Sequence, residues 1–157
     1  MTLYTISGGI DTSFSTKLNQ NFTDVDTTAI NAYTVGTSVT VSPSSSLTAT
    51  VSYSVSAPIK DYVLFHIDGV LNANHGASGD ATSTLSLYAD NTLLQSWAIS
   101  SSTARPSVYN LISPVYLMLP SATQKTAGMS IKVLVAGTAA ATADAFTQLN
   151  RIDVITK

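Results

Sequence analysis

The chain of 157 residues contains no cysteine, and charged residues make up only 10% of it. Without cysteine there can be no disulfide, no thiolate metal site and no cysteine nucleophile. All nine acidic residues are aspartates, and a formal net charge of −2 gives no basic footprint for nucleic acid. No apolar run approaches the roughly 18 residues of a membrane span. We therefore expect neither a nucleic-acid partner nor a membrane partner.

Hydroxyl residues take the place of the missing charges. Serine and threonine number 22 each, so hydroxyls must solvate much of the surface. Hydrophobic residues make up 45% of the chain, which is enough to bury a sizeable core in a single domain. The first residues lack a basic region followed by an apolar one, so the sequence predicts no secretory signal peptide.

Residues 13–35 differ from the rest because their apolar positions follow a helical period. The spacings are 4, 4, 3, 4 and 3, and the hydroxyl, Asn and Asp residues between them are middling to poor helix formers. Packing must therefore hold such a helix, either on its own domain or in a bundle of helices from several copies. The predicted helical interface consists of Phe14, Leu18, Phe22, Val25 and Ala29, with Ala32 ending the stripe.

From Val39 onward the apolar period is two, which is typical of half-buried β-strands. The alternation is complete from Leu47 to Val55, and the last strand slips phase, which a β-bulge near Gln148 would explain. No second helical pattern separates the strands, so the sequence predicts an all-β antiparallel sandwich or barrel of eight or nine strands. The other predicted elements are a hairpin over 82–99, turning at 88–92, and strands at 131–135, 146–156, 60–70 and 113–119.

Two of these strands are apolar on both faces, at 62–67 and 115–119. A sandwich strand normally leaves one face in water, so both need extra cover. A loop or the N-terminal helix of the same chain would supply it, and so would another subunit. We favour an oligomer interface because exposed apolar patches usually mark association surfaces. Its predicted residues are Tyr62, Leu64, His66, Tyr116 and Met118.

The residues that usually carry out catalysis are scarce. The aspartates are scattered, and no Gly-x-Ser-x-Gly motif or phosphate-binding loop occurs. We interpret His66, in an apolar strand, as a core or interface histidine with a satisfied hydrogen bond. His75 could be drawn into a metal site with Asp80 and Asp68, but nothing in the spacing demands it. We expect no enzymatic activity, no metal and no cofactor.

Small polar loops at 72–82 and 137–145 are the candidate ligand loops. The predicted ligand residues are Asn74, His75 and Trp97. The lone tryptophan fits a core position, or a platform for stacking a sugar if it is exposed among polar neighbours.

Two segments resemble known virion proteins. Residues 13–32, with LNQNFTDV at 18–25, resemble the N-x-N-F-x-x-[LIV] helix near the start of many bacteriophage virion proteins. The C-terminal half resembles a phage-type jelly roll of the trimeric tumour-necrosis-factor/C1q-like kind. The matching segments are LMLP at 117–120, TAGMSIKV at 126–133 and RIDVI at 151–155.

The resemblance implies a homotrimeric virion protein with a jelly-roll β-sandwich over 36–157, a helix and linker over 13–35, and an extended arm over 1–12. A small chain of this type is similar to capsid decoration (cement) proteins, which bind the exterior of the head and the major capsid protein. The arm would attach through Leu3, Tyr4 and Ile6. The alternative is a tail-fibre or receptor-binding tip protein that recognises a host-surface glycan.

Overall fold

The computed structural model describes residues 29–157, with side chains from residue 36 onward. The predicted arm, and the helical stripe from Phe14 to Val25, lie outside the described residues. The elements are the strands β1 (Ala29–Val41), β2 (Ser45–Val55), β3 (Val63–Asn74), β4 (Ala81–Ala89), β5 (Thr92–Ser100), β6 (Ser107–Ile112), β7 (Val115–Met118), β8 (Met129–Ala139) and β9 (Asp144–Thr156), and the helix α2 (Ala122–Ala127).

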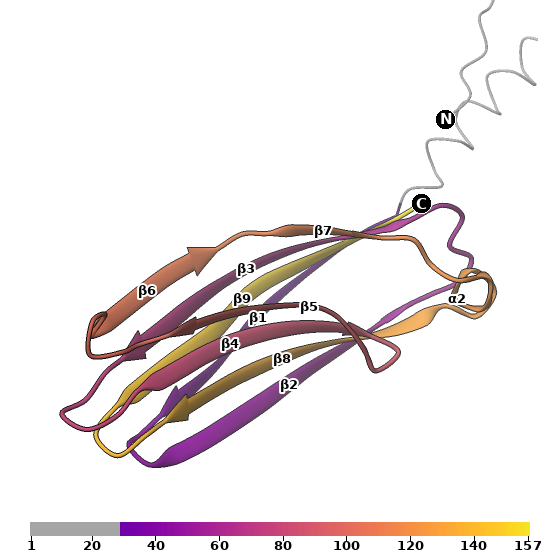
Figure 1. Ribbon diagram of the computed structural model, residues 1–157. Helices are drawn as coiled ribbons and strands as arrows, with labels where there is room; N and C mark the ends of the chain where they lie inside the picture. Colours follow the sequence, from indigo (N-terminus) through magenta and orange to yellow (C-terminus); the bar gives the residue numbers. More distant parts are fainter. Residues whose placement is uncertain (1–28) are drawn as a thin grey trace, which may run out of the picture.

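Two antiparallel sheets lie face to face (Figure 1). One has the order β1-β9-β3-β6, with β7 also paired to β3, and the other has the order β2-β8-β4-β5. Since β6 and β7 follow each other along the same edge of β3, they form one interrupted strand, and eight strand positions remain. This is the topology of a jelly roll, and it confirms the predicted fold class.

The core forms where the inner faces of the two sheets meet. Burial alternates strictly along β3, so that Phe65 and Ile67 are fully buried while the residues between them are half-buried. Leu85, Leu87 and Val133 of the opposite sheet are also fully buried. The alternation predicted over Leu47–Val55 is present in β2 from Ala49 to Val55, where the Ser and Thr residues are exposed, while Leu47 is itself exposed.

Two local irregularities appear near the predicted places. In the β4–β5 hairpin, Asp90 and Asn91 both have positive φ, of 45° and 66°, which suits the tight turns that match the twist of a hairpin. In β9 the pairing with both neighbours skips Asn150, two residues beyond the predicted bulge near Gln148.

The start of the sandwich corrects one prediction. Ala29 pairs with Thr156 and Ala32 with Asp153 in the β1–β9 ladder, so the helical stripe cannot extend to these residues and the sheet begins before residue 36. Residues 29–35 include Ile, Tyr, Thr and Val, which favour strands, and the ladder to β9 supplies backbone hydrogen bonds that an isolated weak helix cannot match.

Two short elements were not predicted. One is strand β6, whose sequence SVYNLI does not alternate cleanly. The six-residue α2 begins with a capping box, in which the Ser121 hydroxyl accepts from the Gln124 backbone N–H and the Gln124 side chain accepts from the Ser121 backbone N–H. The Ser-x-x-Gln pattern in the sequence is typical of such a helix start. No helix within residues 29–157 is long and apolar enough to cross a membrane.

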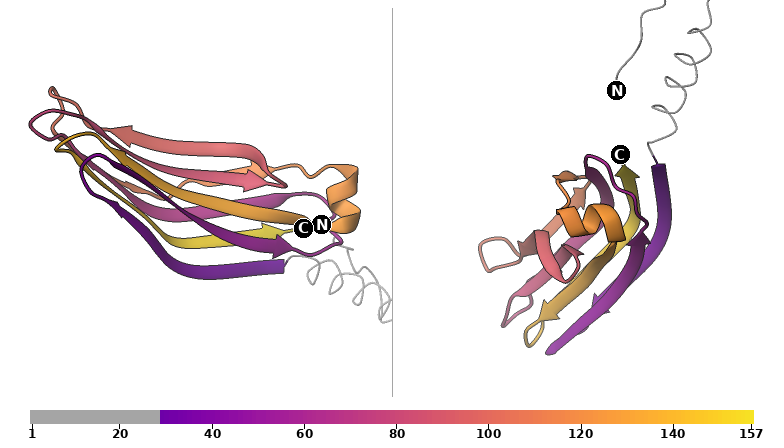
Figure 2. Two further views of the ribbon diagram at one scale, coloured as in Figure 1. Left: turned by 90° about the horizontal axis from the view of Figure 1, so that it is seen from below. Right: turned by 90° about the vertical axis from the view of Figure 1, so that its right-hand side faces the viewer.

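The two ends of the sandwich differ (Figure 2). The β3–β4, β5–β6 and β8–β9 loops gather at one end, while α2, the β4–β5 turn and the C-terminus lie at the other.

The edges of both sheets lack charge. The edge strands β1, β2, β5, β6 and β7 contain no charged residue, and the charges within strands lie on β3, β8 and β9. Natural proteins commonly protect an edge strand with charged side chains, because its unpaired N–H and C=O groups can recruit another chain. These edges have no such protection, which suits strands that become covered.

The core position of Phe65 yields a stability prediction. Phe65→Ala should lower the free energy of unfolding by about 3–5 kcal/mol, because it removes transfer free energy and leaves a cavity. Ser52→Ala, on the exposed outer face of β2, is the control and should stay within about 0.5 kcal/mol. Urea unfolding followed by circular dichroism measures both, and equal losses would contradict the assigned register.

Candidate functional site

An apolar surface covers the outer side of the β3–β6–β7 edge. We call it the β6–β7 face, and it consists of Leu64, Val70, Tyr109, Leu111, Val115, Leu117 and Leu119. Five of these residues lie on β6, on β7 or directly after β7, and they are 57–78% exposed. Among the seven exposed large hydrophobic residues of the described chain, only Leu47 and Leu93 lie outside it. Patches of this kind usually mark association surfaces.

The structure brings the two predicted interface strands together but changes which side chains are available. Leu64 pairs with Leu117 and His66 with Val115 on the outer side. Tyr116 and Met118 pack against the core instead, because they pair with the buried Phe65 and Val63. On β7 the side chains that face outward are therefore those of Val115 and Leu117, and not those of Tyr116 and Met118 as predicted. Tyr62, just before β3, is half-buried.

A polar network lies in the middle of this apolar surface, around His66. The Nδ1 atom of His66 is 3.2 Å from Oδ2 of Asp153, and its Nε2 atom is 2.8 Å from the Ser113 hydroxyl. That hydroxyl donates to Oδ1 of Asp68 at 2.5 Å, and Nε of Arg151 donates to Oδ1 of Asp153 at 2.8 Å. Both ring nitrogens thus have partners, which agrees with the prediction that the hydrogen bonding of His66 is satisfied.

The break between β6 and β7 makes this network possible. Ser113 and Pro114 stand between the two strands, opposite Ile67 and Asp68 of β3. The carbonyl of Pro114 accepts from the backbone N–H of Ile67 at 3.1 Å, so the sheet stays connected across the break. Free of regular pairing, Ser113 places its hydroxyl between the His66 ring and the Asp68 carboxylate.

The carboxylate of Asp153 is held in its ionised form. Burial raises its pKa, but hydrogen bonds from Arg151 and His66 and their charges outweigh burial, and the pKa of Asp153 lies below its ordinary value. With only 12% of its side chain exposed, this carboxylate is the fixed negative charge that the imidazole faces.

Asp153, His66 and Ser113 follow one another in the order of a nucleophile relay. A serine nucleophile must give its proton to the imidazole. Here the Ser113 hydroxyl donates to Asp68 instead, so its proton points away from the ring. The arrangement is therefore suited to holding charge and orienting side chains. A cavity of about 240 Å³ beside it is lined by Asp68, Gly69, Leu111, Ile112, Ser113 and Asn150.

The loop end gathers two of the three predicted ligand residues. Nδ1 of His75 lies 2.8 Å from Oδ1 of Asp80, and Asn74 donates to Asp144 at 2.7 Å and accepts from Ser107 at 2.8 Å. Asp68 belongs to the His66 network, so the metal site considered for His75, Asp80 and Asp68 does not form. No group of three or more potential metal ligands occurs among residues 29–157. Trp97, on β5, is half-buried against the core and away from these loops.

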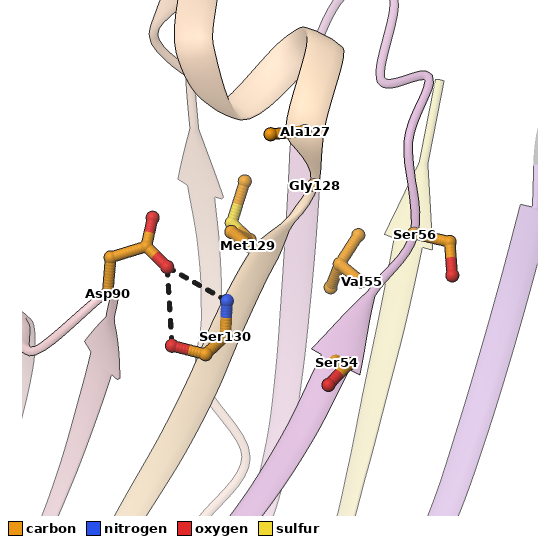
Figure 3. A pocket seen from close by; sticks show the side chains of 8 residues that line it. All are labelled: Ser54, Val55, Ser56, Asp90, Ala127, Gly128, Met129 and Ser130. Atoms are coloured by element: carbon orange, nitrogen blue, oxygen red, sulfur yellow. Dashed lines mark hydrogen bonds between the residues drawn. The ribbon is translucent and has the colours of Figure 1, made fainter.

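A larger pocket, of about 410 Å³, opens at the opposite end beside α2 (Figure 3). Its lining residues are Ser54, Val55, Ser56, Asp90, Ala127, Gly128, Met129 and Ser130. The Asp90 carboxylate accepts from the Gln124 side chain at 2.8 Å and from the backbone and hydroxyl of Ser130 at 2.9 and 3.2 Å. The charged group of this pocket therefore ties the β4–β5 turn to α2 and β8.

Sequence reasoning missed Ser113, Arg151 and Asp153. Ser113 and Asp153 lie 47 and 87 residues from His66 along the chain, so no local sequence pattern connects them. One signal was available: Asp153 stands within the apolar run of the last strand, and a charge in such a place needs a partner.

No protein-family model and no curated protein matches the chain. Among solved structures, it is similar to dimeric latent PorU from Porphyromonas gingivalis, with a TM-score of 0.48 and 14% identity over 82% of this chain and 12% of that one. It is also similar to the VP2 subviral particle of infectious bursal disease virus, with a TM-score of 0.47 and 18% identity over 83% and 33%. A third is TmCBM61 in complex with β-1,4-galactotriose, with a TM-score of 0.35 and 14% identity over 83% and 88%.

This chain thus spans about an eighth of PorU and a third of VP2. Similarity of this degree says nothing of function, so the role of the chain must be argued from its own surface.

The Asp90 contacts predict a pH dependence of stability. Hydrogen bonds from Gln124 and Ser130 lower the pKa of Asp90, so they stabilise the fold above the unfolded-state pKa, and this contribution is lost as pH falls through the folded-state pKa. Asp90→Asn should lower the melting temperature at pH 7 and flatten its fall below about pH 4. Asp61→Asn removes the same charge from an exposed residue and is the control; thermal melts in which both variants behave alike would refute the role of Asp90.

Proposed function

We propose that this protein is a structural component of a virus particle: a bacteriophage capsid decoration protein that binds the exterior of the head as a homotrimer. Its partners are other copies of itself and the major capsid protein, and its place is the capsid surface. It has no catalytic role. The resemblance of residues 13–32 and of the C-terminal strands to phage virion proteins supports the viral assignment.

The β6–β7 face is the observation that carries the proposal of assembly. Burying a leucine or valine side chain contributes about 1.5–3 kcal/mol, so a face with four exposed leucine and valine residues in water loses much stabilisation that a subunit contact would recover. The absence of charge on β6 and β7 supports the same conclusion, since no charge on this edge opposes the approach of another chain.

The alternative, a fibre or tip protein that recognises a glycan, receives less support. Sugar binding by stacking needs an exposed aromatic ring near polar groups, and Trp97 packs against the core instead. Asn74 and His75 do lie among the loops, but their side chains are engaged with Asp144, Ser107 and Asp80.

Self-association through this face is directly testable. Leu117→Lys places a charge in the face and should weaken association at least about tenfold, because it removes the burial of one leucine and adds a charge to desolvate. Sedimentation velocity over micromolar concentrations measures the effect and gives the stoichiometry.

Leu47→Lys is the matched control for that experiment. Leu47 is 49% exposed on β2, in the other sheet, so the substitution adds the same charge outside the face and should leave association unchanged. A wild-type protein that stays monomeric throughout would remove the basis of the proposal.

The attachment arm has its own test. Deletion of residues 1–12 should abolish binding to capsids while the sandwich stays folded and self-associated, because Leu3, Tyr4 and Ile6 supply the contact to the capsid and the core lies elsewhere. Co-sedimentation with undecorated phage heads measures binding. Full occupancy by the shortened protein would refute the role of the arm.

A further inference from the structure

The His66 network lies inside the surface that we propose as a subunit contact, and that position has a consequence for assembly. The inference rests on the proposed self-association. We propose that a second copy of this chain covers the network, and that association therefore requires His66 to be protonated and tightens as the solution becomes acidic.

The hydrogen bonds of the network favour the protonated ring. A charged imidazole donates from both nitrogens, so Nδ1–H meets Asp153 and Nε2–H meets the Ser113 oxygen, whose own proton goes to Asp68. A neutral ring that donates to Asp153 must accept at Nε2, and the single Ser113 proton then cannot serve both His66 and Asp68. Only the charged ring completes all three hydrogen bonds.

The charge of the network leads to the same result. The charged groups that face His66 are Asp68 on its own strand and Asp153 and Arg151 on β9, and β6 and β7 contribute none. With a neutral ring the four side chains sum to −1, and with a protonated ring they sum to zero. Burying an uncompensated charge is costly, while a paired and hydrogen-bonded set is tolerated.

The apolar surroundings of the His66 network indicate which molecule covers it. A neutral network surrounded by Leu64, Leu111, Val115 and Leu117 needs an apolar partner that brings no charge of its own. The β6–β7 face of a second copy is itself apolar, and neither β6 nor β7 carries a charge, so a second copy supplies that surface. The cavity beside Ser113 and Leu111 gives room for a side chain of the partner.

Sedimentation velocity at pH 7.5, 6.5 and 5.5 and constant ionic strength tests the inference. Histidine is the side chain that changes charge in this range. The dissociation constant of the wild-type assembly should fall at least about tenfold from pH 7.5 to 5.5, since each coupled proton contributes up to about tenfold per pH unit. His66→Asn should lose this response.

His75→Asn is the matched control. Both substitutions remove one histidine charge, so they change the net charge of the protein equally at acidic pH, but His75 lies in the loops at the end of the sandwich. His75→Asn should keep the full pH response. This comparison separates the network from any general effect of a net charge close to zero.

Asp68→Asn provides a second test, independent of whether the His66 variant folds. The amide that replaces the Asp68 carboxylate can donate to the Ser113 oxygen, which frees the Ser113 proton for Nε2 of a neutral ring, and the network then carries no net charge when the ring is neutral. This variant should associate at pH 7.5 as the wild type does at pH 5.5, and should not tighten further on acidification.

Two results would overturn the inference: association of the wild type that does not change with pH, or a pH response lost in His75→Asn and kept in His66→Asn. In both cases the proposed self-assembly would stand. A wild type that is monomeric at every pH would instead refute the proposed function itself.

Discussion

The register of β3 is the constraint on which the rest of the molecule depends. This strand pairs with β9 on one side and with β6 and β7 on the other, and its side chains alternate between the core and the outer surface. Phe65 and Ile67 thereby enter the core, while Leu64 and His66 face outward. A shift by one residue would exchange the two sets, so the core and the outer network are specified together.

The fold was predictable because its signals are local, and the network was not because its contacts are distant. The alternation of β2 and the turn at Asp90 and Asn91 can be predicted from a few neighbouring residues, and the structure shows the alternation from Ala49 to Val55 and the turn. The helical stripe continues into Ala29 only because alanine fits either period, and pairing with β9 decides for a strand. The short β6 lacks a clean period altogether.

For the candidate site, the sequence identified the two doubly apolar strands and the histidine but not the orientation of β7. Tyr116 and Val115 are both large and apolar, so composition alone cannot say which faces the core; the pairing with Phe65 decides it. Ser113 was one serine among 22, and only the interruption of the edge strand distinguishes it. Sites of this kind depend on where separate strands meet, which no single window of sequence contains.

The interruption at Ser113 and Pro114 also bears on how such a surface can change over generations. Because the Pro114 carbonyl keeps the sheet joined to Ile67, the serine next to it is not needed for strand pairing. A replacement at this one position would remove the hydrogen bonds that link His66 and Asp68 while the ladder and the core remain. A small gap in a regular sheet thus gives evolution a place where a side-chain network can change separately from the architecture.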